Sequence, residues 1–466
     1  MTDANSRDVL DRIDHEKDRY LAELKEYLRI PSISTDPEYR EDVLRASSFV
    51  RERMEAAGLE TELLSPRDGS GYPLVYGEWT GAPGAPTVLF YGHYDVQPAD
   101  PLDLWRNPPF EPTEEDGFLV ARGATDDKGQ SFTHVKAVEA LLKERGRLPV
   151  NVKFLVEGEE ESGGQSIERY VREDRGERLS CDCIVVSDTS MYAPGQPSLI
   201  YGLKGLCYME IQVTGPNKDL HSGSFGGGVM NPLNALCHIV SRLWNVETGR
   251  VEIPGFYDAV RPLEDWEREE LGGLPFDEEQ YAASLGVEQT FGEEGYTTRE
   301  RIWGRPTCDV NGIFGGYEGR GAKTVIPSWG GAKVSMRLVP DQDPEEIGRL
   351  FREHVARVTP PGVTIEILDH HGARPVRLET EGAVFESALE ALGSVWGARP
   401  VLVREGGSIP IVGTFAEVLR VPILMMGFGL PDDGLHSPNE RFKIENFHQG
   451  IRSVTVFLDR LGGAKE

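Results

Sequence analysis

The sequence predicts an α/β fold, in which an open sheet with helices on its faces is interrupted by a smaller α+β domain. Short apolar runs alternate with amphipathic segments along the front of the chain, a pattern typical of strands and helices in an open α/β sheet. The pattern changes near Gly205 and returns after about Arg374. We therefore expect one domain built from residues 1–204 and 374–466, with residues 205–373 inserted between its two parts.

The first part begins with two predicted helices. Residues 9–28 carry apolar side chains at helical spacing, and a second helix at 41–57 is followed by Gly58, which suits the position just after a helix end. The alternation then predicts, in chain order, a strand at 86–91, a helix at 129–144 and strands at 150–158 and 181–188.

The inserted segment reads differently. It opens with a strand at 206–215 that we expect to be exposed, and a polar stretch from about 246 to 306 carries no predicted element. The other elements expected from the pattern are a helix at 231–244, strands within 328–340, a helix at 344–358, a strand at 363–369 and, after the insertion, a helix at 382–392 and a strand at 421–427.

Composition limits the class of protein. With 466 residues and 39% hydrophobic content, the chain has enough apolar material for two or three globular units. Its net charge of −28 argues against nucleic-acid and anionic-membrane partners, because phosphate binding needs a basic surface. Five cysteines without zinc-knuckle spacing, no apolar segment at the N-terminus and no long apolar stretch lead us to expect a cytoplasmic location and no membrane span.

Candidate metal ligands follow the first predicted strand. His93 and Asp95 stand two residues apart directly after the apolar run, so both side chains can lie on one face. A histidine that binds a metal usually has a carboxylate to orient its ring. A surface histidine beside an acid would explain the same pair.

Two further clusters precede or follow predicted elements. In residues 122–129, which enter a helix, Asp126 offers a carboxylate, although Thr125 or Asp126 could instead cap that helix. Residues 157–164 follow a buried strand and hold four acids in five positions, which could also be a solvated turn. The remaining candidates are Asp188, after an apolar run, and His436, late in the chain.

The combination of these clusters favours a metal centre. Open α/β sheets place their ligands beyond the carboxyl ends of the strands, where most of these residues are expected. Several carboxylates converging there would repel one another and need cations. Histidine with carboxylate suits zinc, and also manganese or cobalt, and a pair of such ions can activate water and polarise a carbonyl.

The chain resembles the M20 metallopeptidases, and within them the group of cytosolic nonspecific dipeptidases and carnosinases. The motifs that carry the resemblance stand in family order from Tyr91 to Glu440: YGHYDVQP, RGATDDKGQ, EGEEESGG, SDTS, LHSGSFGG, GAKTVIP, RLVP, REGGSIP and GLHSPNE. The resemblance covers nearly the whole chain. It implies a di-metal catalytic domain and an inserted lid domain that mediates dimerisation.

The resemblance also implies a role for individual residues. The metal ligands would be His93, Asp126, Glu161, Asp188 and His436, with Asp126 bridging the two ions and a cis peptide bond following it. Glu160 would be the base that takes a proton from the bridging water, and Asp95 would support His93. His221 would reach the partner subunit's site and stabilise the oxyanion. The groups that hold the substrate carboxylate would be Thr324, Arg337 and Ser408.

These roles predict hydrolysis of dipeptides with a free C-terminal carboxylate by a homodimer that holds two divalent ions per subunit, zinc first, with manganese or cobalt as alternatives. The resemblance associates aspartate at position 188 with dipeptidases. An N-acyl-amino-acid deacylase or a carboxypeptidase of the same family is the alternative activity. A non-catalytic metal-binding scaffold is a further alternative, but it would have no use for Glu160, which the resemblance leaves outside the ligand set.

Overall fold

The computed structural model describes residues 6–66, 69, 71–174 and 177–463. The chain forms two compact units, and the short segment 404–409 groups with the insertion, which the sequence patterns did not indicate. Unit 1 comprises residues 1–201, 378–403 and 410–466, and unit 2 comprises residues 202–377 and 404–409.

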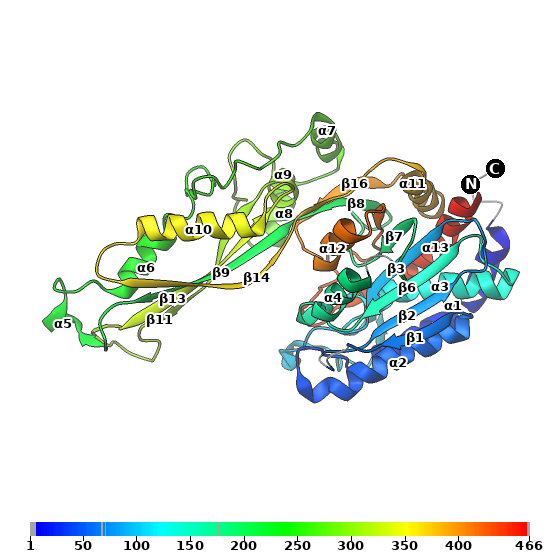
Figure 1. Cartoon of the computed structure of the whole chain (residues 1–466), viewed down its shortest axis with the longest axis horizontal. Coiled ribbons are helices and arrows are strands. Elements are labelled where there is room, and N and C mark those ends of the chain that lie inside the picture. Colours follow the sequence, from blue (N-terminus) through cyan, green and yellow to red (C-terminus); the bar gives the residue numbers. More distant parts are fainter. Residues whose placement is uncertain (1–5, 67–68, 70, 175–176, 464–466) are drawn as a thin grey trace. The chain divides into compact units, whose positions relative to one another are not determined.

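Unit 1 contains an α/β sheet (Figure 1). Its helices are α1 (Arg7–Leu28), α2 (Arg40–Ala57), α3 (Lys128–Arg145), α4 (Gln165–Asp174), α11 (Ala383–Trp396), α12 (Pro410–Val418) and α13 (Ile444–Gly463). Its strands are β1 (Glu60–Leu64), β2 (Leu74–Trp79), β3 (Thr87–His93), β4 (Thr113–Glu115), β5 (Phe118–Val120), β6 (Asn151–Glu157), β7 (Cys183–Val186), β8 (Ser198–Leu203, entering unit 2), β16 (Val401–Glu405, likewise), β17 (Ile423–Met425) and β18 (Arg441–Lys443).

The strand order explains where a site can form. The main sheet runs β1-β2-β6-β3-β7-β17-β8, and β6, β3, β7 and β17 are parallel to one another. Their side chains are buried almost without interruption, as expected for parallel strands covered on both faces. Their carboxyl ends therefore share one edge of the sheet.

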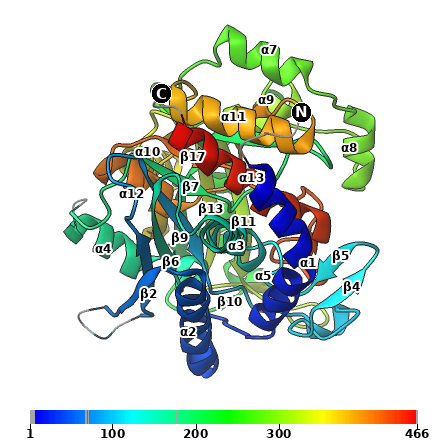
Figure 2. The same cartoon turned by 90° about the vertical axis from the view of Figure 1, so that its right-hand side faces the viewer.

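Helices cover both faces of this sheet, as two neighbouring residues of β3 demonstrate. The ring of Phe90 lies 4.6 Å from that of His134 on α3, and the ring of Tyr91 lies 5.7 Å from that of Phe415 on α12. Successive strand residues point to opposite faces, so α3 and α12 lie on opposite sides. Helices α1, α2 and α13 pack against α3, as Figure 2 shows with α3 among them.

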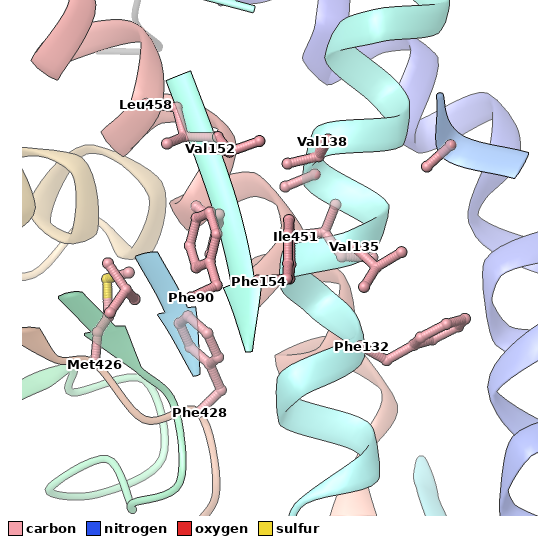
Figure 3. Close-up of a cluster of buried hydrophobic side chains, with 14 of the residues drawn as sticks. Phe90, Phe132, Val135, Val138, Val152, Phe154, Met426, Phe428, Ile451 and Leu458 are labelled. Atoms are coloured by element: carbon pink, nitrogen blue, oxygen red, sulfur yellow. The ribbon is translucent and has the colours of Figure 1, made fainter. Parts of the chain in front are cut away.

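The main core lies between the sheet and these helices. Figure 3 shows Phe90 and Phe154 from the strands beside Val138 of α3 and Ile451 of α13, and all four are buried. No helix among the described residues is both long and apolar enough to cross a bilayer.

Unit 2 is a one-sided antiparallel layer. Its elements are β9 (Gly205–Thr214), β10 (Leu220–His221), α5 (Ser222–Phe225), α6 (Pro232–Val240), α7 (Asp265–Gly273), α8 (Glu278–Ser284), α9 (Thr298–Gly304), β11 (Thr307–Gly315), β12 (Val325–Ile326), β13 (Trp329–Leu338), α10 (Pro344–Val358), β14 (Thr364–Ala373) and β15 (Val376–Arg377). The sheet order is β11-β13-β9-β14, and α6 and α10 pack on it.

The predicted fold class is confirmed: an α/β sheet in one unit and an α+β layer in the insertion. Two expectations are wrong in detail. The strand expected to be exposed, β9, lies between β13 and β14 and buries Met209 and Ile211, because alternate residues face the helices. The stretch without predicted elements contains the short helices α7, α8 and α9, which begin at capping residues such as Thr297.

The packing predicts a large difference between two leucines of unit 1. Leu458, on α13, is fully buried and Leu102 is 59% exposed. We expect Leu458→Ala to lower the free energy of unfolding by about 2–5 kcal/mol, because it removes buried methyl groups and leaves a cavity. Leu102→Ala should change it by less than about 0.5 kcal/mol. Urea unfolding of both variants measures this, and equal losses would contradict the assigned core.

Candidate metal centre

Three neighbouring parallel strands deliver side chains to the same edge of the main sheet. His93 is the last residue of β3, and Asp188 follows β7 by two residues. Glu160 and Glu161 lie in a 3₁₀ turn, Glu160–Ser162, shortly after β6. Ligands in open α/β sheets bind beyond the carboxyl ends of the strands. The sheet order thus brings residues from three separate sequence clusters together.

Asp126 reaches this edge from the loop before α3. The peptide bond Asp126-Asp127 is cis, as the resemblance implied. The capping alternative is wrong: the residue at the start of α3 is Asp127, and its side chain makes no capping hydrogen bond. Oδ2 of Asp127 instead accepts the backbone N–H of His93 (3.2 Å). The Asp126 carboxylate remains available to the site.

The expected ligands form two groups that share Asp126. His93, Asp126 and Asp188 make one group, and Asp126, Glu161 and His436 make the other, with the ligand atoms of each group within 4.8 Å of one another. Asp126 faces both histidines with different oxygens: Oδ1 lies 3.1 Å from Nε2 of His93, and Oδ2 lies 2.9 Å from Nε2 of His436. This is the arrangement of a bridging carboxylate.

Asp95 sets the orientation of the His93 ring. Nδ1 of His93 lies 3.1 Å from the Asp95 carbonyl oxygen and 3.3 Å from Oδ1 of Asp95, so Nδ1–H donates toward Asp95 and Nε2 is left for a metal. Oδ2 of Asp95 accepts hydrogen bonds from the Ser34 hydroxyl (2.7 Å) and from the backbone N–H of Glu161 (3.0 Å). Asp95 therefore contacts one candidate ligand of each group, His93 through its backbone carbonyl and Glu161 through its carboxylate.

Glu440 holds the loop that carries Asp126. Its Oε1 accepts the backbone N–H groups of Thr125 (3.0 Å) and Asp126 (3.1 Å). Its Oε2 accepts the N–H of Gly123 (2.9 Å) and Nη1–H of Arg122 (2.8 Å). Arg122 and Glu440 are both almost completely buried. This buried pair thus fixes the backbone on which the shared carboxylate stands.

His436 lies four residues before Glu440, on the solvent side of the centre. Its side chain is 57% exposed, whereas that of His93 is fully buried. Its φ is 58°, in the left-handed region that non-glycine residues seldom adopt and that concentrates at functional sites. The exposed histidine marks the open side of the centre.

The carboxylates of this centre repel one another in a buried environment. Burial and the neighbouring aspartates raise the pKa of Asp188 well above its ordinary value, and burial and Asp126 raise the pKa of Glu161 to about 8. For Asp126, burial acts to raise the pKa, but hydrogen bonds with His436 and His93 outweigh it and hold the pKa below its ordinary value. A divalent cation at these atoms would offset the burial and the repulsion.

Glu160 stands beside the ligands but belongs to neither group. It lines a small pocket together with Glu157 and Ile411. Burial raises the pKa of Glu160 to about 7, and the charge of Asp126 acts in the same direction. The charges of Asp126 and of both histidines act on this group, so Glu160 lies close to the candidate ligands.

The donor set fits a pair of divalent cations. Each group offers one histidine nitrogen and carboxylate oxygens, the mixed donors that zinc, manganese and cobalt accept. Oε1 of Glu161 is buried without a hydrogen-bond partner. A buried carboxylate oxygen of this kind is costly unless a cation takes it up.

The remaining predicted residues lie in unit 2, in two pairs. Nη1 of Arg337, on β13, donates to the hydroxyl of Ser408 (3.1 Å). His221 pairs with Val325 in the β10–β12 ladder, and Thr324 accepts the backbone N–H of Ser222 (3.0 Å). His221 and Thr324 are exposed, whereas Arg337 and Ser408 are half-buried.

The sequence patterns missed the residues that hold the ligands in place. Glu440 and Gln97 stand within the family motifs GLHSPNE and YGHYDVQP, which assign them no role, and Ser34 stands outside every motif. Gln97 donates from Nε2 to Oε2 of Glu161 (2.8 Å). These contacts join residues that are 61 to 317 positions apart, so local sequence patterns do not reveal them. The one available signal was the position of Glu440, four residues after His436.

Comparisons with known proteins agree with this geometry. Residues 89–460 match the family model described as "Peptidase family M20/M25/M40". The Cys-Gly metallodipeptidase of Schizosaccharomyces pombe is 35% identical, over 96% of this chain and 97% of that protein.

Two solved structures have the same fold over nearly their whole length. The crystal structure of human carnosine dipeptidase 1 superimposes with a TM-score of 0.87 at 30% identity and covers 99% of this chain and 100% of that one. An M20 family metallo-carboxypeptidase from Sulfolobus solfataricus gives 0.84 at 34% identity, over 95% of this chain and 99% of that one.

The contacts of Glu440 predict an effect on metal binding. We expect Glu440→Gln to lower metal affinity about 10–100-fold, the usual cost of changing a residue that supports ligands, because an amide nitrogen would face backbone donors. The variant should also lose about 3–5 kcal/mol of unfolding free energy, since Arg122 stays buried without its partner. Calorimetric titration with zinc and urea unfolding measure the two effects.

The matched control is Glu445→Gln, whose carboxylate is 64% exposed and pairs with Lys443. It should change stability by less than about 1 kcal/mol and leave metal binding unchanged. Unchanged zinc affinity in Glu440→Gln would show that this carboxylate does not position the centre.

Proposed function

Because the chain belongs to peptidase family M20/M25/M40, we propose that it is a metallodipeptidase that hydrolyses dipeptides with a free C-terminal carboxylate. The observation that carries the proposal is the pair of ligand groups sharing Asp126, with Glu160 beside them and outside both. The similarity to a Cys-Gly metallodipeptidase and a carnosine dipeptidase over nearly the whole chain supports it.

The metal content follows from the donor set. We propose that His93 and Asp188 hold one divalent ion, that Glu161 and His436 hold the other, and that Asp126 serves both. Zinc is the first candidate, with manganese or cobalt as alternatives. When bound, such a pair lowers the pKa of water and polarises a carbonyl.

The chemical roles of the protein groups follow from their positions. Glu160 would take a proton from the attacking water and later give it to the leaving amine, the work of a general base that becomes a general acid. Asp95 would keep Nε2 of His93 available by accepting from Nδ1–H. In unit 2, Arg337 would bind the substrate carboxylate, for which a guanidinium offers paired donors, and Ser408 orients that guanidinium.

The geometry of unit 2 supports a homodimer. His221 and Thr324 lie near the end of the sheet at which β13 starts with Trp329. At this end, the backbone N–H of Ser328 donates a hydrogen bond to Asp219. In Figure 1, α5 lies beyond the same end. Arg337 lies eight residues further along β13, roughly 26 Å at 3.3 Å per residue.

A dipeptide spans only about 7 Å, so one chain cannot bring both pairs to one substrate. We propose that His221 and Thr324 serve the site of a second copy, across a two-fold contact. His221 would then stabilise the oxyanion there. Exposed apolar side chains near His221 fit such a contact: Phe225, Val229, Tyr317 and Trp329.

A carboxypeptidase is the second candidate, favoured by the similarity to the Sulfolobus solfataricus metallo-carboxypeptidase. Both activities need the metal centre and a group that binds the substrate carboxylate. They differ in whether the substrate must have a free amine close to that carboxylate. A screen of dipeptides, tripeptides and N-acetyl amino acids with zinc and with manganese separates them. For location we propose the cytoplasm, in line with the acidic composition and the free cysteines.

The role of Glu160 predicts a split between turnover and metal content. We expect Glu160→Gln to lower kcat by about 10²–10⁴-fold, because a proton acceptor is lost, while bound metal measured by elemental analysis stays at the wild-type level. Glu168→Gln changes an exposed residue of the same pocket and should retain activity. Near-normal turnover of Glu160→Gln would remove this residue from the mechanism.

The two-fold arrangement predicts complementation between two inactive variants. His221→Ala and Glu160→Gln are each expected to be inactive alone. After subunit exchange, one site of a mixed dimer combines an intact Glu160 with His221 of the other copy, so activity should return to part of the wild-type value. The specific activity of the mixture measures this. Demonstrated exchange without recovery, or a fully active monomer, would show that each chain completes its own site.

A further inference from the structure

Glu405 is a half-buried glutamate of unit 2, and one of its carboxylate oxygens is buried without a partner. It ends β16, and its Oε2 is buried without a hydrogen bond. Within the described part of unit 2, no other carboxylate oxygen is in this condition. Two fully buried glutamates of the unit are paired, in contrast: Glu267 with Arg404 and Glu293 with Arg305. The unpaired oxygen of Glu405 is therefore an exception within unit 2, and a bound cation would offset the cost of its burial.

The backbone around Glu405 is firmly held. The N–H of Lys204 donates to the carbonyl oxygen of Glu405 (3.2 Å), and the carbonyl oxygen of Lys204 accepts the hydroxyl of Ser408 (2.5 Å). That same hydroxyl accepts Nη1–H of Arg337 (3.1 Å). The backbone of Lys204 thus holds both ends of the segment from Glu405 to Ser408. The backbone of Glu405 therefore has a fixed position relative to Ser408, which contacts Arg337.

No cation among the described residues forms an ion pair with Glu405. The nearby Nζ of Lys204 donates instead to the carbonyl oxygen of Arg301 (3.1 Å). Burial raises the pKa of Glu405 to about 7. Removing an unpaired carboxylate oxygen from water is unfavourable, and no hydrogen bond from the described residues compensates for the burial of Oε2.

The spacing suits the two ends of one small zwitterion. Ser408 lies three residues after Glu405, so their backbones are at most about 11 Å apart, and a dipeptide spans about 7 Å between its amine and its carboxylate. Glu405 could bind a cation, and Ser408 with its partner Arg337 could bind an anion. Together they suit a small ligand that carries both charges.

We propose that Glu405 binds the free α-ammonium group of the substrate while Arg337 and Ser408 bind its carboxylate. This rests on the proposed dipeptidase function and deepens it. Glu405 is then a specificity-determining residue, which selects dipeptides over N-acyl amino acids, which have no ammonium group. It also selects them over longer peptides, whose amine lies further from the C-terminal carboxylate.

The test uses the full-length, metal-loaded protein and two substrates that differ only in the amine: glycyl-leucine and N-acetyl-leucine. We expect Glu405→Gln to lower kcat/KM for glycyl-leucine about 10–100-fold, the size of a hydrogen bond to a charged group, mainly through KM. The kcat/KM for N-acetyl-leucine should stay the same or rise. Where N-acetyl-leucine is not turned over, its inhibition constant against glycyl-leucine cleavage replaces kcat/KM.

Two further variants control the experiment. Glu279→Gln removes an exposed carboxylate of unit 2 and should change neither substrate. Glu405→Asp keeps the charge on a shorter side chain and should recover part of the preference for glycyl-leucine. The unfolding midpoint of Glu405→Gln should equal or exceed that of the wild type, because an unpaired buried charge is removed.

The outcomes separate this inference from the proposed function. Equal losses on both substrates, or an unchanged preference in Glu405→Gln, would overturn the role of Glu405 and leave the dipeptidase standing. A wild-type protein that cleaves no dipeptide with zinc or manganese would overturn the proposed function itself.

Discussion

The candidate metal centre depends on one carboxylate, that of Asp126, which both ligand groups share. Asp126 faces His93 with one oxygen and His436 with the other, and the two histidines come from a strand end and from a loop more than three hundred residues later. Neither group is complete without Asp126. Everything that fixes this residue therefore fixes both groups at once, and Glu440 does so through the backbone N–H of Asp126 and three further donors.

Buried negative charge is the main electrostatic feature of the chain. Most carboxylate oxygens that are buried without a partner belong to unit 1, in or beside the cluster that includes Glu157, Glu159 and Glu161. Such a concentration opposes folding unless cations bind, since desolvation and mutual repulsion act in the same direction. Metal binding to the folded state should then contribute to stability as well as to chemistry.

Unit 2 separates two kinds of recognition group along one extended sheet. Arg337 and Ser408 lie near one end with Glu405, and His221 and Thr324 lie near the other. The length of β13 keeps these two pairs apart within a chain, and the proposed two-fold arrangement rests on this separation.

The sequence by itself determined the fold class and the set of candidate ligands. Apolar periodicity located α1, α2, α3 and α10 to within one or two residues, because hydrophobic spacing is local information. The sequence clusters offered acids and histidines where a parallel sheet collects ligands, and the family resemblance then selected His93, Asp126, Glu161, Asp188 and His436 from among them. Short capped helices in a polar stretch escaped detection, since α7, α8 and α9 have too few apolar positions for a clear period.

Only the tertiary structure decided which hydrogen bonds position the candidate ligands and which charged side chains lack a partner. The contacts of Glu440 and Asp95 join distant segments, and no local pattern encodes a hydrogen bond across hundreds of residues. The isolation of Glu405 is likewise invisible in sequence, because whether a glutamate is paired depends on every side chain that the fold brings near it. The type of a residue indicates which chemistry its side chain can perform. Tertiary packing determines which charged side chains remain unpaired and so available to a ligand.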